Sequence, residues 1–215
     1  MNEDGILELG ERKCREWIGK RPDDPWAHSN LGLELCRRGR YPEAEQAFRE
    51  ALRLKPGSVK VLVGLGKVLR KQARFTEAEE LYRQALRRRP AEPRALFGLG
   101  VSLVRQERFE EAERVFRTAL GLWPDHLSCR MGLADLLART ERCGEALEHF
   151  ERALLVCESK DMCLVIQVRL NKLRLKKSCE DRMKIKGKEG FRHFPRYGGS
   201  EGRARKHGWL SMGRG

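Results

Sequence analysis

The chain has 215 residues, 40% of them hydrophobic and 35% charged, and its formal net charge of +14 falls mainly on residues 161–215, which hold 15 Lys and Arg against five Asp and Glu. The first 160 residues, with 30 Lys and Arg against 26 Asp and Glu, are close to balanced, which argues against a nucleic-acid-binding body. No stretch approaches the roughly 18 uninterrupted apolar residues of a membrane span, and the acidic start lacks the layout of a secretory signal, so we expect a cytoplasmic protein.

A single helix is predicted within residues 1–24. Its Cys14, Trp17, Ile18 and Pro22 fill the slots of the second half of the 34-residue repeat that follows. We therefore predict that this segment is an N-terminal capping helix, equivalent to half a repeat.

Four copies of a 34-residue pattern follow in direct succession. The first half of each copy carries an apolar stripe at helical spacing, such as Leu31, Gly32 and Leu35, and the small residue lets a neighbouring helix approach closely. The second half places an aromatic residue, such as Phe48, between two alanines on one helical face, and a proline ends the first three copies. Each copy therefore predicts two short antiparallel helices that can bury their apolar faces only by stacking on neighbouring copies. The copies are residues 25–58, 59–92, 93–126 and 127–160.

The Leu-Gly pair, the aromatic residues, the alanines and the closing proline at this period resemble the tetratricopeptide repeat (TPR) family. The resemblance covers residues 25–160 and implies an all-α fold, a right-handed α-solenoid of TPR helix-turn-helix repeats, with TPR 1 to TPR 4 at the four ranges above. The fourth copy is divergent, because Ala134 replaces the glycine, Cys143 the aromatic residue of the turn and Glu158 the closing proline. We expect weaker packing of that copy, or its adaptation to a different neighbour.

The segment after the repeats is predicted to be helical but out of register with them. Gln167 and Asn171 fall where the repeat places leucines. Residues 161–178 are interpreted either as a C-terminal capping helix that covers the last apolar face, or as a basic amphipathic helix for an anionic membrane or a calmodulin-like partner. Residues 179–215, rich in Gly, Lys and Arg, are predicted to be a basic disordered tail.

The sequence shows no arrangement of residues typical of catalysis or metal binding. Its seven cysteines are irregularly spaced without a Cys-x-x-Cys motif, which predicts reduced, mostly buried thiols and neither a disulfide framework nor a metal site. The five histidines are scattered, and the Gly-Leu-Gly stretches belong to the repeat rather than to a phosphate-binding loop. We therefore expect a non-enzymatic protein with no catalytic residues, no cofactor and no small-molecule substrate.

The family resemblance implies a concave groove, lined by the first helix of each repeat, that binds peptides or other proteins. The basic residue at the end of each first helix admits two interpretations: a cation favoured by the helix dipole, or a ladder of charges along the groove edge. The cations of the second and third repeats favour a groove that is positive in its middle. The predicted groove residues are Trp26, Leu33, Arg37, Lys60, Val63, Lys67, Arg70, Lys71, Arg94, Phe97, Val101, Arg105, Met131 and Arg139.

The predicted function is that of a protein–protein interaction adaptor or scaffold, which binds a peptide or partner protein of acidic and apolar character in the concave groove. The alternative is binding of nucleic acid or an anionic membrane surface through the basic tail, whose Phe191, Phe194, Tyr197 and Trp209 could stack on bases. A solvated tail without such a role is the simpler interpretation. Self-association through an uncapped end, and derivation from a longer TPR protein, are interpretations that the sequence leaves open.

Overall fold

The computed structural model describes the backbone of residues 3–189 and the side chains of residues 10–177. Within this part of the chain all regular structure is helical, and the all-α solenoid predicted from the sequence is confirmed. The chain divides into two compact units, Met1–Lys177 and Ser178–Gly215, and the contacts below concern the first. The ten helices of the described residues are α1 (Glu3–Lys20), α2 (Pro25–Arg37), α3 (Tyr41–Leu54), α4 (Val59–Lys71), α5 (Phe75–Arg88), α6 (Pro93–Arg105), α7 (Phe109–Leu122), α8 (Leu127–Arg139), α9 (Cys143–Leu155) and α10 (Lys160–Glu189).

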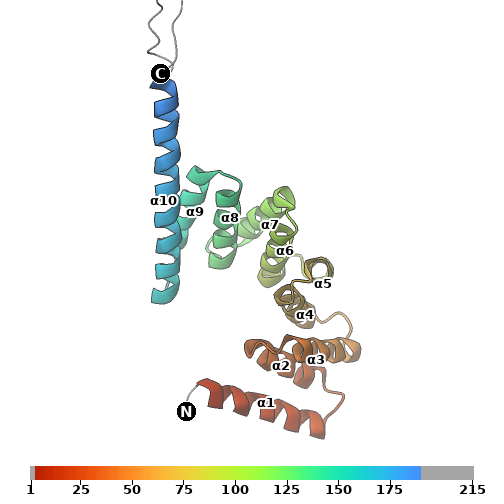
Figure 1. Cartoon of the computed structure of the whole chain (residues 1–215). Coiled ribbons are helices and arrows are strands. Elements are labelled where there is room, and N and C mark those ends of the chain that lie inside the picture. The colour runs from red at the N-terminus through yellow and green to blue at the C-terminus, as the bar shows by residue number, and fades with distance from the viewer. Residues whose placement is uncertain (1–2, 190–215) are drawn as a thin grey trace, which may run out of the picture. The chain divides into compact units, whose positions relative to one another are not determined.

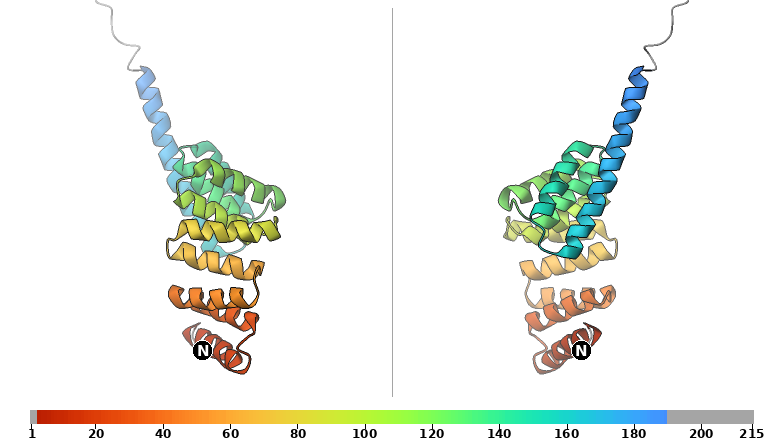
Figure 2. Two further views of the ribbon diagram at one scale, coloured as in Figure 1. Left: turned by 90° about the vertical axis from the view of Figure 1, so that its right-hand side faces the viewer. Right: turned by 90° about the vertical axis from the view of Figure 1, so that its left-hand side faces the viewer.

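The helices from α1 to α9 follow one another along a stack, each packed on the next (Figure 1). The two side views show the same order, from red α1 to green α9 (Figure 2). The pairs α2–α3, α4–α5, α6–α7 and α8–α9 each fall within one of the predicted repeat ranges. The limits of the repeats and of the N-terminal cap stay predictions.

Local sequence signals explain where several helices begin. Pro25, Pro42 and Pro93 lie in the first turns of α2, α3 and α6, where a missing amide hydrogen has no cost. The carboxylate of Asp24 accepts a hydrogen bond of 2.9 Å from the backbone amide of Trp26 and caps the start of α2.

Contacts between an aromatic ring and two glycines join neighbouring repeats. Tyr82 on α5 is buried against Gly66 of its own repeat and Gly98 of the next. Three such contacts involve six glycines in all. A methyl group added at any of the six would come within 2.3 to 2.9 Å of a ring carbon, well inside van der Waals contact. Glycine therefore allows each ring to lie directly against two helix backbones. The other two contacts are Phe48 with Gly32 and Gly64, and Phe116 with Gly100 and Gly132.

A ladder of glutamates also joins the repeats, and sequence reasoning missed it. On α5, the carboxylate of Glu79 accepts hydrogen bonds from Arg108 of the next repeat at 2.8 Å and from Gln106 at 2.8 Å. The ladder ends after four members, because Leu147 takes the next slot. We call the four carboxylates the inter-repeat glutamates; their ion pairs are Glu11–Arg40 (2.9 Å), Glu45–Arg74 (2.7 Å), Glu79–Arg108 (2.8 Å) and Glu113–Arg142 (2.7 Å).

The structure differs from the sequence prediction in the length of α10. This helix continues to Glu189, whereas the sequence predicts disorder from residue 179 onward. The stretch CEDRMKIKGKE has no proline and one glycine, and its Glu, Arg, Met and Lys residues favour helix, so local propensity outweighs the overall low apolar content. The remainder of the predicted tail, with Phe191, Phe194, Tyr197 and Trp209, lies outside the described residues.

The described part of the chain lacks both a membrane span and a metal site. No helix within residues 3–189 is long and apolar enough to cross a membrane. Among residues 10–177, whose side chains the structure describes, no group of three or more His, Cys, Asp or Glu could hold a metal ion.

The cysteines should differ strongly in reactivity. Cys129 is fully buried, and burial raises the pKa of its thiol to about 12, while Cys157 is half-buried two residues beyond the end of α9. The thiolate is the nucleophile, and this rise of the pKa lowers the fraction of Cys129 that is present as thiolate roughly a thousandfold. We expect iodoacetamide to alkylate Cys157 well before Cys129 in the native protein, and both together in denaturant, as followed by mass spectrometry. Equal native rates would contradict this burial.

Candidate partner-binding groove

A cavity of about 810 Å³ lies at the C-terminal end of the repeats, between α6, α8 and α10. Its lining combines apolar and cationic side chains, as a site for an amphipathic ligand requires. We call it the C-terminal cavity. Its apolar residues include Val101, Val104, Phe116, Leu136, Ala138, Phe150 and Leu173, and its charged residues are Arg105, Asp135, Arg139, Arg169, Lys172 and Lys176.

One substitution within the repeat pattern explains why a cavity opens at this place. Helices α4, α6 and α8 present Gly64, Gly98 and Gly132 to the aromatic ring of the preceding helix. Thirty-four residues after the last of these glycines, α10 carries Ile166. Its branched side chain is buried, so α10 cannot approach Phe150 on α9 as closely as the earlier helices approach their rings. We attribute the C-terminal cavity, which Phe150 and Leu173 both line, to this wider spacing.

The electrostatics of the C-terminal cavity are dominated by cations. Asp135 is the one carboxylate among its lining residues, and it forms an ion pair with Arg169. Burial raises the pKa of Asp135 although the neighbouring guanidinium of Arg169 favours its charged form. The other four charged lining residues are cations, so the cavity offers a positive rim to a ligand with carboxylates.

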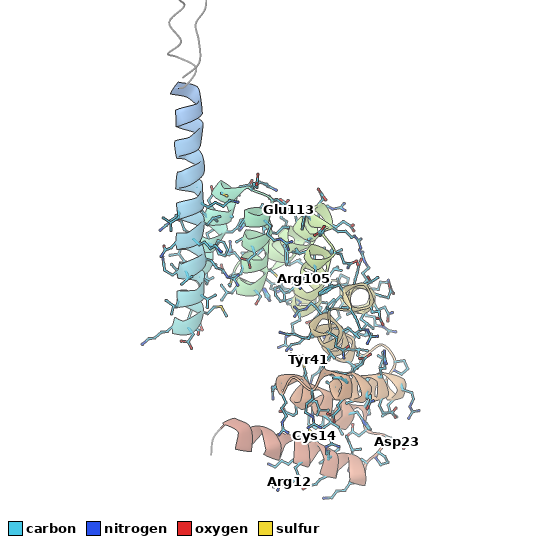
Figure 3. The ribbon with its side chains drawn as sticks, viewed as in Figure 1. Arg12, Cys14, Asp23, Tyr41, Arg105 and Glu113 are labelled. Atoms are coloured by element: carbon cyan, nitrogen blue, oxygen red, sulfur yellow. The ribbon has the colours of Figure 1, made fainter. Side chains whose placement is uncertain are left out.

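Aromatic stacking positions two of these cations. The guanidinium carbon of Arg105 lies 5.2 Å from the ring centroid of Phe75, and that of Arg139 lies 5.3 Å from the ring centroid of Phe109. Such contacts contribute about 0.5–1 kcal/mol at exposed sites. Figure 3 labels Arg105 on α6 and, for orientation, Glu113 on the neighbouring helix α7. Stacking on the preceding repeat is thus a third role for the recurring basic slot, besides the helix dipole and ligand binding.

Six of the fourteen predicted groove residues line cavities, in two groups of three. Val101, Arg105 and Arg139 line the C-terminal cavity. Three others line a smaller cavity of about 220 Å³ between α4 and α6, together with Val59, Arg89 and Glu92. Those three are Lys60, Val63 and Arg94.

The remaining apolar residues of the predicted groove line neither cavity. Leu33, Phe97 and Met131 are half-buried and pack against the core, and the Phe97 ring lies 6.5 Å from that of Phe116. Trp26 is 60% exposed. The structure therefore uses most of these side chains at least partly for packing.

The remaining cations have different neighbours. Arg37 pairs with Glu34 on its own helix at 2.5 Å, and Arg70 lies near buried Tyr82, where its charge partly offsets the rise that burial causes in the pKa of the phenol. Lys67 and Lys71 are exposed. Of the predicted cations, the structure brings Arg105 and Arg139 together around one cavity, and Lys60 and Arg94 around the other.

Sequence reasoning missed the contribution of α10 to the cavity. Arg169 and Lys172 lie 34 residues after Asp135 and Ala138, which line the same cavity. Extending the repeat register by one more period would have identified both residues. The same extension identifies Leu173, which lies 34 residues after Arg139. Lys176 falls in the slot of Arg142, which does not line the cavity, so the register gives no signal for it.

The helices form pairs, each helix 13 or 14 residues long, and the pairs stack through aromatic–glycine contacts. A cavity opens along first helices of these pairs. Together these features define a TPR α-solenoid. The chain belongs to the tetratricopeptide repeat family. The family model described as tetratricopeptide repeat matches residues 63–126 and 100–160. The model of the cilia and flagella-associated protein 70 middle TPR-like domain matches residues 15–81.

Solved TPR structures are similar to this chain over most of its length, whereas no curated protein matches it in sequence. MamA from Desulfovibrio magneticus is 25% identical with a TM-score of 0.64, over 74% of this chain and 89% of that one. A thermophilic TPR protein of Thermus thermophilus is 20% identical with a TM-score of 0.67, over 80% and 92% of the two chains. YrrB, described as a TPR protein with an unusual peptide-binding site, is 19% identical with a TM-score of 0.57, over 77% and 84%. The fold and the family support a protein–protein interaction scaffold.

Proposed function

We propose that this chain is a non-enzymatic adaptor that binds an extended peptide of acidic and apolar character along its first helices. The observation that carries the proposal is the C-terminal cavity, with apolar walls and a rim of cations. The smaller cavity continues the same chemistry between α4 and α6, where Lys60 and Arg94 flank Val63. YrrB, which is similar in fold, is described as having a peptide-binding site.

The two kinds of lining residue would have different roles. Apolar side chains of the peptide would fill the walls around Val101, Val104 and Leu173 and remove apolar surface from water. Carboxylates of the peptide would meet Arg105 and Arg139, whose positions are fixed by aromatic stacking, and hydrogen bonds to charged groups contribute about 1.5–3 kcal/mol each.

The test fills the cavity without changing its charge. The probe is a labelled peptide of Glu and Asp residues around two Phe residues, with a central proline that prevents helix formation. Ala138→Trp should weaken its binding by about tenfold or more, measured by fluorescence anisotropy, because the indole occupies the cavity. Ala91→Trp, at an exposed position in the turn between α5 and α6, is the matched control and should leave the affinity unchanged.

Charge reversal provides the second arm of the test. Arg139→Glu should weaken binding about tenfold, whereas Arg37→Glu, in the equivalent slot of the first repeat and outside both cavities, should have little effect. Binding that is unchanged in both Ala138→Trp and Arg139→Glu would exclude the C-terminal cavity as the site.

A further inference from the structure

The last helix presents a row of apolar side chains to solvent. Ile166, Leu170 and Leu173 of α10 are buried against the stack. On the opposite face of the same helix, Leu164, Val168 and Leu175 are 64%, 59% and 69% exposed. We call these three residues the outer row. Isolated exposed leucines are ordinary, but three exposed aliphatic side chains aligned on one face of a helix indicate an interaction surface. A helix that only capped the repeats would have a solvated outer face.

The outer row results from a rotation of α10 relative to the earlier first helices. Leu164 occupies the slot of Leu62 and Leu96, which are buried in α4 and α6. In α10, Gln167 and Asn171 stand where the earlier helices bury leucines, and neither is buried here. Because these polar side chains cannot enter the core, α10 turns a different face inward and Leu164 outward.

The spacing of the outer row indicates what shape of partner fits it. Leu164, Val168, Asn171 and Leu175 follow one another at intervals of four, three and four residues. This is the seam of a helix that pairs with another helix, and a single polar residue such as Asn171 in such a seam fixes the register of the pair. An extended peptide or a strand would not use this spacing.

The charges around the outer row indicate the chemistry of the partner. Lys172 lies one helical turn from both Val168 and Leu175 and is exposed. Two further cations of α10 are already paired, Arg169 with Asp135 and Arg174 with Glu151. From Lys160 to Lys177 the helix contains six Lys and Arg and one Asp, so a second copy of α10 would bring like charges together, whereas an acidic helix would complement them.

We propose that the outer row of α10 docks an amphipathic helix of a partner protein, with aliphatic seam residues flanked by carboxylates. The outer row itself lines no part of the C-terminal cavity, although the flanking Lys172 also lies at the edge of that cavity. The proposal therefore does not depend on peptide binding in the groove. One chain would then engage two partners, or two segments of one partner.

The experiment uses the full chain and synthetic helical probes of about three heptads. One probe has Leu at the seam and Glu on the flanks; a second has the same seam with Lys on the flanks; a third has the composition of the first in scrambled order. The acidic seam peptide should bind about tenfold more tightly than either other probe, in fluorescence anisotropy at physiological salt.

Leu164→Ser and Leu175→Ser should each weaken binding of the acidic seam peptide by about tenfold, because an apolar contact is lost at unchanged charge. Leu122→Ser on α7, also an exposed leucine, is the matched control and should leave the affinity unchanged.

Three results would overturn the proposal. Equal binding of the scrambled acidic probe would show that charge alone is recognised. A dimer in sedimentation velocity that is lost in Leu164→Ser would identify a second copy as the occupant. Binding to phosphatidylserine vesicles that is lost in both serine variants, without binding of the acidic seam peptide, would identify a membrane surface.

Discussion

Replacing Gly98 by alanine should lower the free energy of unfolding by about 3 kcal/mol, the upper part of the range for overpacked cores. The added methyl carbon would lie 2.3 Å from a ring carbon of Tyr82, which is the tightest of the aromatic–glycine contacts in the described residues. The ring is buried between two helix backbones and cannot move aside, so α6 must shift away from α5.

The measurement is urea unfolding followed by far-ultraviolet circular dichroism. Gly121→Ala on α7 is the matched control, because no atom lies within 4 Å of the added carbon. That substitution should instead stabilise the protein by about 0.5–1 kcal/mol, since alanine loses less backbone entropy than glycine in a helix. Similar stabilities of the two variants would show that the ring does not restrict the approach of the helices.

Replacing Glu79 by glutamine should cost about 2 kcal/mol of stability, because Arg108 and Gln106 lose the charged acceptor that holds the two repeats together. Glu80→Gln, on the same helix, removes an exposed pair with Arg87 and weakens an exposed hydrogen bond from Gln84, and it should change the free energy of unfolding by less than about 0.5 kcal/mol. Equal effects of the two substitutions would contradict a special role for the inter-repeat glutamates.

The same residue predicts how stability depends on pH. Burial alone would raise the pKa of Glu79, but hydrogen bonds from Gln106, Arg83 and Arg108, together with the charge of Arg108, outweigh it and hold the pKa below its ordinary value. A lowered folded-state pKa means that the stabilisation is fully present above the unfolded value of about 4.3 and is lost as the pH falls through the folded value. The difference in stability between the natural protein and Glu79→Gln should therefore shrink below about pH 4.

Acid sensitivity of this kind should extend beyond one interface. The pKa values of Glu11 and Glu113 are also held below the ordinary range, in each case because arginine hydrogen bonds outweigh the effect of burial. Contacts between successive repeats would thus weaken together as the carboxylates become protonated.

The fold could be predicted from the sequence because the period of 34 residues fixes which residues face a neighbouring helix. The residue types at Gly98 and Tyr82 predict their contact, since few other pairs of residue types fit those slots. The residue types at Glu79 and Arg108 do not predict their ion pair, because Glu and Arg are also the commonest residues of a solvated helix surface. Only the burial of Glu79 and its 2.8 Å contact with Arg108 of the next repeat distinguish this pair from surface charges.

The candidate site was predictable in part. The slots of Val101 and Arg105 follow from the repeat, and both line the C-terminal cavity. The cavity itself depends on how far α10 stands from α9 and on how α10 is rotated. We attribute the spacing to buried Ile166, and the rotation to Gln167 and Asn171, whose polar side chains stay out of the core. A pattern that describes regular repeats carries no information about the helix at which the regularity ends.

The absence of a fifth inter-repeat glutamate has a consequence for cooperativity. In a linear array, each repeat is stabilised by its nearest neighbours, so the array opens first at its weakest junction. The junction between α9 and α10 has Leu147 in the glutamate slot and Ile166 in the glycine slot, and so lacks both devices that fasten the earlier ones. A ligand held by residues on both sides of that junction would act as the missing fastener, and occupancy would then govern how often the terminal helix detaches.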